Sequence, residues 1–349
     1  MPEQALVQSP LGVMTVLCAV AAFYFYLERV TQWRVFKYFP PLLWIYATPV
    51  ALNNTGLIAS SSPAYTGLRS YALPIFIVLM LIYVNVPAAI RVMGKGVLVM
   101  LMGTVGVVVG GVAAFWIVGP YLAPDAWRGF GTLAGSWIGG TGNMAAAAEA
   151  LHTSEEQFGL AVLADNLVYI VWMPLLLTSK SFADKFNRWA RVPEDRILMM
   201  EQAASIEEKD QREVIFQDYL YLAIVALSVT WLGGALAENL PEVPPVLSTS
   251  TWKILIITTI ALSLSVTPLR RIPGGQAVAT AIIYVFVAAM GARASLAGLN
   301  QAPVFVAGAF IWVTIHGSFC LLGGLFGFWL SSLLAVLGGA IAQMHQEDR

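Results

Sequence analysis

Two short stretches of this sequence hold the residue types that could do chemistry. The first, GSWIGGTGNMAAAAEALH at residues 135–152, is too apolar for an ordinary loop, yet it contains more glycine and polar side chains than an ordinary membrane helix. The second, LADNLVYIVWMPLLL at residues 163–177, places Asp165 and Asn166 inside an apolar run. An ionised carboxylate near the centre of a membrane span costs about 2.5–3.5 kcal/mol on insertion scales, so Asp165 must face a partner or water.

Asp165 and Asn166 together offer carboxylate and amide oxygens, the ligands that hard cations such as sodium prefer. We therefore predict that this pair couples transport to an ion, either by binding sodium or by taking up a proton. The alternative is a purely structural hydrogen bond between Asp165 and a neighbouring helix. Apart from a sodium ion, the sequence predicts no cofactor and no metal site.

The glycine-rich stretch has the composition of a broken helix. Gly139, Gly140 and Gly142 give the backbone the freedom that a sharp turn needs, and Thr141 and Asn143 offer hydrogen-bond donors and acceptors beside that turn. The following MAAAAEA is a small-sided helix suited to tight packing. Because the positive end of that helix could point at a carboxylate, we predict that these five residues bind the substrate.

The elements that position these residues must be membrane helices. The chain has 349 residues, 58% of them hydrophobic and 11% charged, with a mean hydropathy of +0.74, which is far outside the usual range for soluble proteins. The lipid bilayer is therefore its first partner, and a formal net charge of −1 gives no reason to expect nucleic acid. The sequence contains no HExxH or Walker motif and no GxSxG in a strand–turn–helix context, so we predict no enzyme and no catalytic residue.

A membrane span needs about 20 mostly apolar residues. By this criterion the sequence predicts an all-α, polytopic transmembrane bundle with helices near 10–28, 39–58, 71–91, 96–118, 157–178, 214–236, 252–268, 276–292 and 303–325. Two further apolar stretches, 131–151 and 327–343, are rich in Gly, Ala or Ser. Each of them either crosses the membrane or enters and leaves on the same side.

The basic residues decide between these topologies. If both stretches are re-entrant and the N-terminus is outside, 15 of the 19 Lys and Arg residues lie inside, as the positive-inside rule requires. The four that lie outside are Arg69, Arg128, Lys253 and Arg293. If 131–151 crosses fully and 327–343 does not, only seven lie inside. We therefore predict a re-entrant 131–151 in a multi-pass protein of the inner (plasma) membrane.

The polar segment 179–213 divides the chain, and we expect it to be a cytoplasmic linker with one surface helix. Residues 1–178 form a first repeat with an odd number of crossings. A second copy in 214–349 would sit in the opposite orientation, as in an inverted repeat of about five spans each, with re-entrant Gly-rich segments. This second repeat is expected to lack its last span, as in a truncated protein, unless 327–343 merely extends the preceding helix.

Other polar residues in apolar surroundings have simpler interpretations. Asn53, Asn54 and Thr55 either end the second span at the outer face or line a pathway. Glu149 and His152, three residues apart on one helix face, are interpreted as an interfacial pair, with a metal or proton-relay role as the alternative.

The default for His316 is an imidazole bonded to a backbone carbonyl. The spacing of Gly106 and Gly110 indicates helix packing.

The two motifs resemble a family of integral membrane proteins catalogued as domain of unknown function 819. The resemblance rests on GSWIGGTGNMAAAAEAL followed by LADNLVYIVWMPLLL, and the order of spans agrees across most of the chain. That family is distantly similar to sodium/glutamate symporters and inverted-repeat cation antiporters, in which paired broken helices form the substrate and ion sites. The resemblance covers Gly139, Gly140 and Asn143 in the first motif and Asp165 with Asn166 in the second.

In the second half, the family pattern resembles ANIGGPATAAA, and AVLGGAIAQ here keeps Gly338 and Gly339 as the second part of the substrate site. The chain differs at Val336, where Asn is expected, and at Ala340, where Pro is expected. By analogy with similar transporters, the resemblance also implies a homodimer.

These observations predict a secondary transporter of a small organic anion, coupled to sodium or protons. The glycine-rich tip would bind the anion, and Asp165 with Asn166 would couple it to the ion. The alternative is a non-transporting membrane scaffold that uses the same fold to bind lipid or a partner, which the incomplete second repeat favours.

Overall fold

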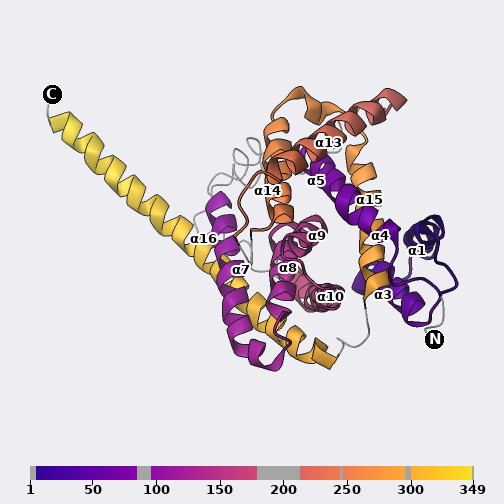
Figure 1. Ribbon diagram of the computed structural model, residues 1–349. Coiled ribbons are helices and arrows are strands. Elements are labelled where there is room, and N and C mark those ends of the chain that lie inside the picture. The colour runs from indigo at the N-terminus through magenta and orange to yellow at the C-terminus, as the bar shows by residue number, and fades with distance from the viewer. Residues whose placement is uncertain (1–4, 85–95, 179–212, 244–246, 295–299, 348–349) are drawn as a thin grey trace. The chain divides into compact units, whose positions relative to one another are not determined.

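The computed structural model describes residues 5–84, 96–178, 213–243, 247–294 and 300–347. Within these residues every named element is a helix, and pairing between extended segments is limited to two isolated β-bridges (Figure 1). The chain divides into two compact units, which are described separately. The first unit comprises Met1–Asn85, Ala114–Ile170 and Gln211–Ala309, and the second comprises Val86–Ala113, Val171–Asp210 and Phe310–Arg349.

Six helices are long and apolar enough to cross a membrane, as judged by length and composition within the described residues. These are Pro10–Thr31, Pro63–Leu81, Val97–Tyr121, Phe216–Ala237, Gly275–Arg293 and Ala302–Gly324. The other three predicted spans are also helices: α3 (Pro41–Asn54), α10 (Glu155–Thr178) and α14 (Thr249–Leu264). The prediction of an all-α protein with several membrane helices is therefore confirmed, whereas the inverted repeat stays a prediction.

The third span begins earlier than hydropathy predicts, at Pro63 rather than at residue 71. The Ser62 hydroxyl accepts a hydrogen bond from the Ala64 amide, so Ser62 is the N-cap. Pro63 occupies the first helical position, where its missing N–H costs nothing. A good capping sequence thus extends the helix beyond its most apolar part.

This span contains a π-helical turn, η1 (Leu68–Ala72), between α4 (Pro63–Gly67) and α5 (Leu73–Leu81). Pro74 lacks the N–H that an α-helix would donate to the Ser70 carbonyl four residues earlier. The wider turn is the local response to that missing donor, and it leaves the Ser70 carbonyl available to another group.

The predicted break in 131–151 is confirmed. The stretch falls into α8 (Ala126–Gly139) and α9 (Thr141–Ala150), which pack side by side (Figure 1). Between them Gly140 has φ 82° and ψ −172°, a backbone conformation open essentially to glycine alone. Re-entry of this hairpin into the bilayer stays a prediction.

Glycines on one side of α8 let α9 approach closely. A Cβ on Gly135 would lie 2.6 Å from the Asn143 carbonyl oxygen, and one on Gly131 would overlap the Leu151 side chain. The two helices therefore pack backbone to backbone, as small residues permit.

Helix α3 ends at Asn54 with Thr55 as its C-cap, so the interpretation of this polar cluster as a helix end is confirmed. The Asn54 amide donates to the Val50 carbonyl of its own helix and to the Ala294 carbonyl, directly after α15 (Gly275–Arg293). α15 packs against α3, where Gly291 leaves room for the backbone of Tyr46.

In the second unit, parts of α7 (Gly96–Val118) and α16 (Ala302–Glu347) meet through glycines on α7. Cβ atoms on Gly106 and Gly110 would crowd Phe319 and Trp312, which confirms the packing interpretation of this spacing. The nearby His316 Nδ1 lies 3.0 Å from the Gly103 carbonyl oxygen. Because a carbonyl only accepts, Nδ1 donates to it, and the expected imidazole–carbonyl bond is confirmed.

The predicted second re-entrant segment is wrong, because α16 continues without a break through Gly338 and Gly339 to Glu347. The alternative, an extension of the preceding helix, is what the structure has. The physical reason is local: two glycines cost a helix only about 1 kcal/mol each, whereas the proline that would break it is replaced here by Ala340. Nothing tests whether Gly338 and Gly339 bind substrate. The predicted linker 179–213 lies outside the described residues except for its last residue.

Candidate functional site

The Asp165 carboxylate is held by the hairpin. The Ser136 hydroxyl donates to Asp165 Oδ2 and the Trp137 indole nitrogen donates to Oδ1, both at 2.9 Å. Ser136 and Trp137 lie in the last turn of α8, directly before the break at Gly140. The partly buried acid of α10 and the last turn of α8 therefore form one site.

These two hydrogen bonds are charge-assisted and favour the ionised carboxylate. They confirm the structural contact that was the alternative interpretation of Asp165. A carboxylate oxygen has two lone pairs, however, so each oxygen can still accept from or coordinate a second group. Binding of sodium or a proton by Asp165 stays a prediction.

Asn166 is buried, with 6% of its surface exposed, and its amide nitrogen donates to the Val162 carbonyl of α10 at 2.7 Å. This back-bond fixes the side chain against its own helix. The amide oxygen is then the atom of Asn166 that could act as a neutral ligand.

The turn of the hairpin is exposed. Gly139, Gly140 and Asn143 are exposed, and a Cβ on Gly140 would have no atom within 4 Å. Thr141 begins α9, and its N-cap, Gly140, has no side chain that could cap the first amides of that helix. Gly142 lies against the Phe76 ring of α5. The structure thus brings all five predicted residues of the first motif to one uncapped helix N-terminus.

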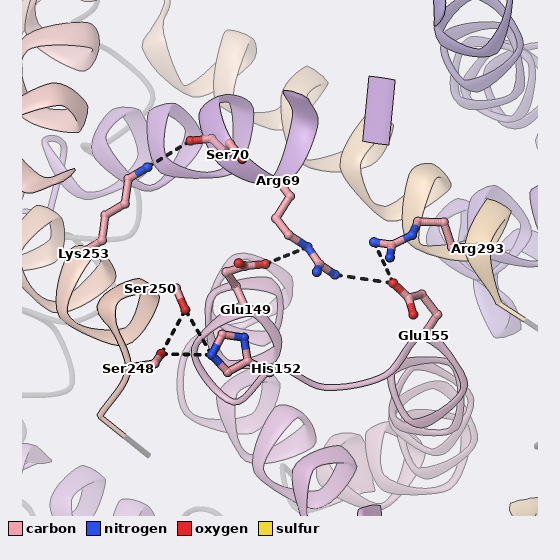
Figure 2. A network of polar contacts seen from close by, with 9 residues as sticks. All are labelled: Arg69, Ser70, Glu149, His152, Glu155, Ser248, Ser250, Lys253 and Arg293. Atoms are coloured by element: carbon pink, nitrogen blue, oxygen red, sulfur yellow. Dashed lines mark hydrogen bonds and ion pairs between the residues drawn. The ribbon is translucent and has the colours of Figure 1, made fainter. Parts of the chain in front are cut away.

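A second polar cluster went unrecognised in the sequence (Figure 2). Arg69 Nε lies 2.9 Å from Glu149 Oε2, and Arg69 Nη2 lies 3.4 Å from Glu155 Oε1. Arg293 Nη1 lies 2.7 Å from the same Glu155 oxygen. We call these four residues the outer ion-pair cluster, after the side to which the predicted topology assigns Arg69 and Arg293. It joins η1 and α15 to the end of α9 and the start of α10.

The interpretation of Glu149 and His152 as an interfacial pair stays a prediction, and each residue makes side-chain contacts with a different helix. Glu149 binds Arg69, whereas His152 Nε2 lies 3.0 Å from the Ser248 hydroxyl at the N-cap of α14 (Figure 2). Arg128 donates to the His152 carbonyl oxygen at 2.9 Å. Spacing on one helix did not decide the partners, because other helices offered better ones.

Lys253 uses the acceptor that the π-helical turn leaves available. Its ammonium donates to the Ser70 carbonyl at 3.0 Å (Figure 2). This contact ties the first turn of α14 to η1. At the same end, Glu242 accepts from both the amide and the hydroxyl of Thr249, and these hydrogen bonds lower the pKa of the Glu242 carboxyl.

All four basic residues that the predicted topology leaves outside make their contacts at this end of the first unit. They are Arg69, Arg128, Lys253 and Arg293. Their partners include carboxylates and carbonyl oxygens, so each exception to the positive-inside rule has a specific contact. The sequence did contain a signal for this cluster: four cations are predicted to lie outside, together with nearby acidic residues.

The chain just after α5 contacts the loop before α15. Tyr83 donates to the Ile272 carbonyl oxygen at 2.5 Å and accepts from the Gly275 amide at 3.1 Å. Hydropathy placed Tyr83 within the predicted span 71–91, whereas the basic residues assigned the loop that contains Ile272 to the inner side. The side of the membrane on which this contact lies stays a prediction.

A family model described as "Protein of unknown function (DUF819)" matches residues 15–342. The chain belongs to this family. A curated relative, the uncharacterised membrane protein YjcL of Bacillus subtilis (strain 168), is 24% identical over 276 residues, which cover 76% of this chain and 69% of that protein. The hairpin, Asp165 and the outer ion-pair cluster all lie within the DUF819 match. The more distant similarity to sodium/glutamate symporters stays an expectation.

Proposed function

We propose that this DUF819 protein is a secondary transporter that couples a small organic anion to sodium or protons. The observation that carries the proposal is the juxtaposition of a broken-helix hairpin with a partly buried acid. In transporters, broken helices place polar backbone where substrate and ions bind. Here the break at Gly140 and the Asp165 carboxylate are linked through Ser136 and Trp137.

The start of α9 supplies the substrate side of the proposal. Its N-cap is Gly140, which has no side chain to cap the first amides, and Gly139, Gly140 and Asn143 are exposed. An uncapped helix N-terminus carries a partial positive charge and free N–H groups, which together attract an anion. Thr141 and Asn143 would add side-chain hydrogen bonds.

Asp165 supplies the coupling side. Ser136 and Trp137 orient its two oxygens, and the Asn166 amide oxygen follows it on α10. A sodium ion or proton bound there would change the charge at the hairpin, so the ion and the anion would favour each other's binding. A plasma-membrane location and a homodimeric state belong to the same proposal.

The test is uptake by the full chain in reconstituted vesicles. We expect an imposed sodium or proton gradient to drive accumulation of at least one radiolabelled mono- or dicarboxylate, and Asp165→Asn to abolish the gradient dependence. Asp125→Asn, which removes a carboxylate from the loop before α8, should leave it intact. Gradient-independent behaviour of both wild type and Asp165→Asn would reject the proposal and favour the scaffold alternative.

A further inference from the structure

Two guanidinium groups from different helices meet at one carboxylate oxygen in the outer ion-pair cluster. Glu155 Oε1 lies 2.7 Å from Arg293 Nη1 and 3.4 Å from Arg69 Nη2. Figure 2 shows the Arg69 and Arg293 guanidinium groups converging on the same Glu155 oxygen from two directions. Glu155 is the first residue of α10, the helix that also carries Asp165.

The three ion pairs join two cations, Arg69 and Arg293, to two carboxylates, Glu149 and Glu155. At Glu155 Oε1, however, two guanidinium groups share one oxygen, so positive charge is in excess at that atom (Figure 2). The side chains of Arg69 and Arg293 are each 32% exposed, whereas that of Glu155 is 16% exposed. As whole side chains, the two arginines are thus more exposed than the carboxylate that they share, although the Arg69 Nε atom is buried.

This arrangement has the chemistry of a carboxylate receptor. The planar guanidinium fork matches a carboxylate better than an ammonium does, and Arg–carboxylate hydrogen bonds are among the strongest in proteins. The Glu155 side chain already fills the site with the chemical group that the two arginines recognise. Partly exposed ion pairs are worth only about 1 kcal/mol or less, so a resident carboxylate of this kind is exchangeable.

We propose that Arg69 and Arg293 form a binding site for small carboxylates at the outer end of the protein, and that an incoming carboxylate replaces Glu155. This inference rests on the proposed transport function, because it names the substrate class and its first contact. Exchange of the occupant frees the start of α10 from η1 and α15. The carboxylate that binds outside thereby loosens the helix that holds the ion-coupling acid.

The variant that separates this site from a structural ion pair is Glu155→Gln. Ligand cannot bind while the Glu155 side chain occupies the site. The apparent affinity for ligand is therefore the intrinsic affinity multiplied by the fraction of time that the site is free. Removing the competing charge should therefore lower the half-saturating ligand concentration by about five-fold. If Glu155 forms only a structural ion pair, Glu155→Gln should instead raise the half-saturating ligand concentration, because the loss of the pair would only destabilise this part of the protein.

The experiment measures the thermal unfolding midpoint of the purified full chain in detergent against acetate, succinate and citrate, at constant ionic strength. We expect saturable stabilisation by at least one of them, shifted to lower concentration in Glu155→Gln and lost in Arg293→Gln. The controls are Glu156→Gln, which removes a nearby negative charge, and Arg128→Gln, which removes a nearby positive charge. Neither residue belongs to the three ion pairs, so both variants should match the wild type. Arg293→Lys keeps the charge without the fork and should retain folding with weakened binding.

Equal stabilisation by sulfate would overturn the carboxylate assignment. So would an unchanged or higher half-saturating concentration in Glu155→Gln, or no saturable effect of any of the three acids. Because the assay uses no gradient, its result is independent of transport: binding without any uptake rejects the proposed function alone. Coupled uptake with an unaffected Glu155→Gln rejects this inference alone.

Discussion

The Trp137 indole nitrogen lies 2.9 Å from Asp165 Oδ1 and donates its hydrogen to that oxygen. Residue 137 belongs to the arm of the hairpin that ends at the Gly140 break, and residue 165 belongs to the next helix of the chain. An acid placed in an apolar run is thus satisfied by the segment whose own helix is interrupted. This one hydrogen bond therefore contributes to the stability of the protein and also orients the carboxylate that we propose for ion coupling.

Trp137→Phe should destabilise the protein, because it keeps an aromatic ring but removes the donor to a partly buried carboxylate. We expect a loss of about 1.5–3 kcal/mol in the free energy of unfolding, the range for hydrogen bonds to charged groups. Chemical denaturation in detergent would measure it. Trp116→Phe is the control, since Trp116 is 82% exposed on α7 and should stay within about 0.5 kcal/mol of the wild type. Equal effects of the two changes would contradict the assignment.

Gly135→Ala should force the arms of the hairpin apart. The added methyl would lie 2.6 Å from the Asn143 carbonyl oxygen, which is backbone and cannot rotate away. Overpacking of this kind costs about 1–3 kcal/mol, measurable as a lower unfolding midpoint. Gly67→Ala provides the matched control within a helix, because its Cβ would meet nothing within 4 Å. We expect that change to be neutral or stabilising, and the prediction fails if both variants behave alike.

Lys253→Met should cost about 1–3 kcal/mol, because the Ser70 carbonyl loses its donor while the length of the side chain is kept. Lys253→Arg keeps a donor and should cost less. The sharper measurement is a double-mutant cycle with Pro74→Ala, which restores an N–H four residues after Ser70.

In the Pro74→Ala background, the Lys253→Met cost should fall by about 0.5–1.5 kcal/mol, since the carbonyl regains a partner within its helix. Strict additivity of the two changes would show that Lys253 does not compensate for the proline.

Cysteine labelling should reveal the predicted orientation. In a background in which the two free thiols, Cys18 and Cys320, are replaced by serine, we expect a membrane-impermeant maleimide on intact cells to label Ser60→Cys. Arg271→Cys should be labelled only after permeabilisation. Both positions are exposed, so protection reports the side of the membrane. The physical basis is the 15 of 19 basic residues assigned to the inside. Labelling in the reverse order would overturn this topology.

Much of the fold could be predicted because its signals are local. Runs of apolar residues located the helices, and the glycines around Gly140 located the break, since backbone freedom depends on the residue at that position alone. The end of α3 at Asn54 followed from the polar residues there. The same local reasoning failed at Gly338 and Gly339, where glycines without a neighbouring proline left α16 unbroken.

The sequence by itself determined that Asp165 lies in an apolar run and needs a partner, and that four cations are exceptions to the positive-inside rule. Only the tertiary structure decided which partners they have. Arg69 meets Glu149 and Glu155, and Arg293 meets Glu155, across long stretches of chain. Hydropathy and spacing describe one helix at a time, whereas an ion pair depends on the packing of several helices, so no pattern within a single segment could specify it.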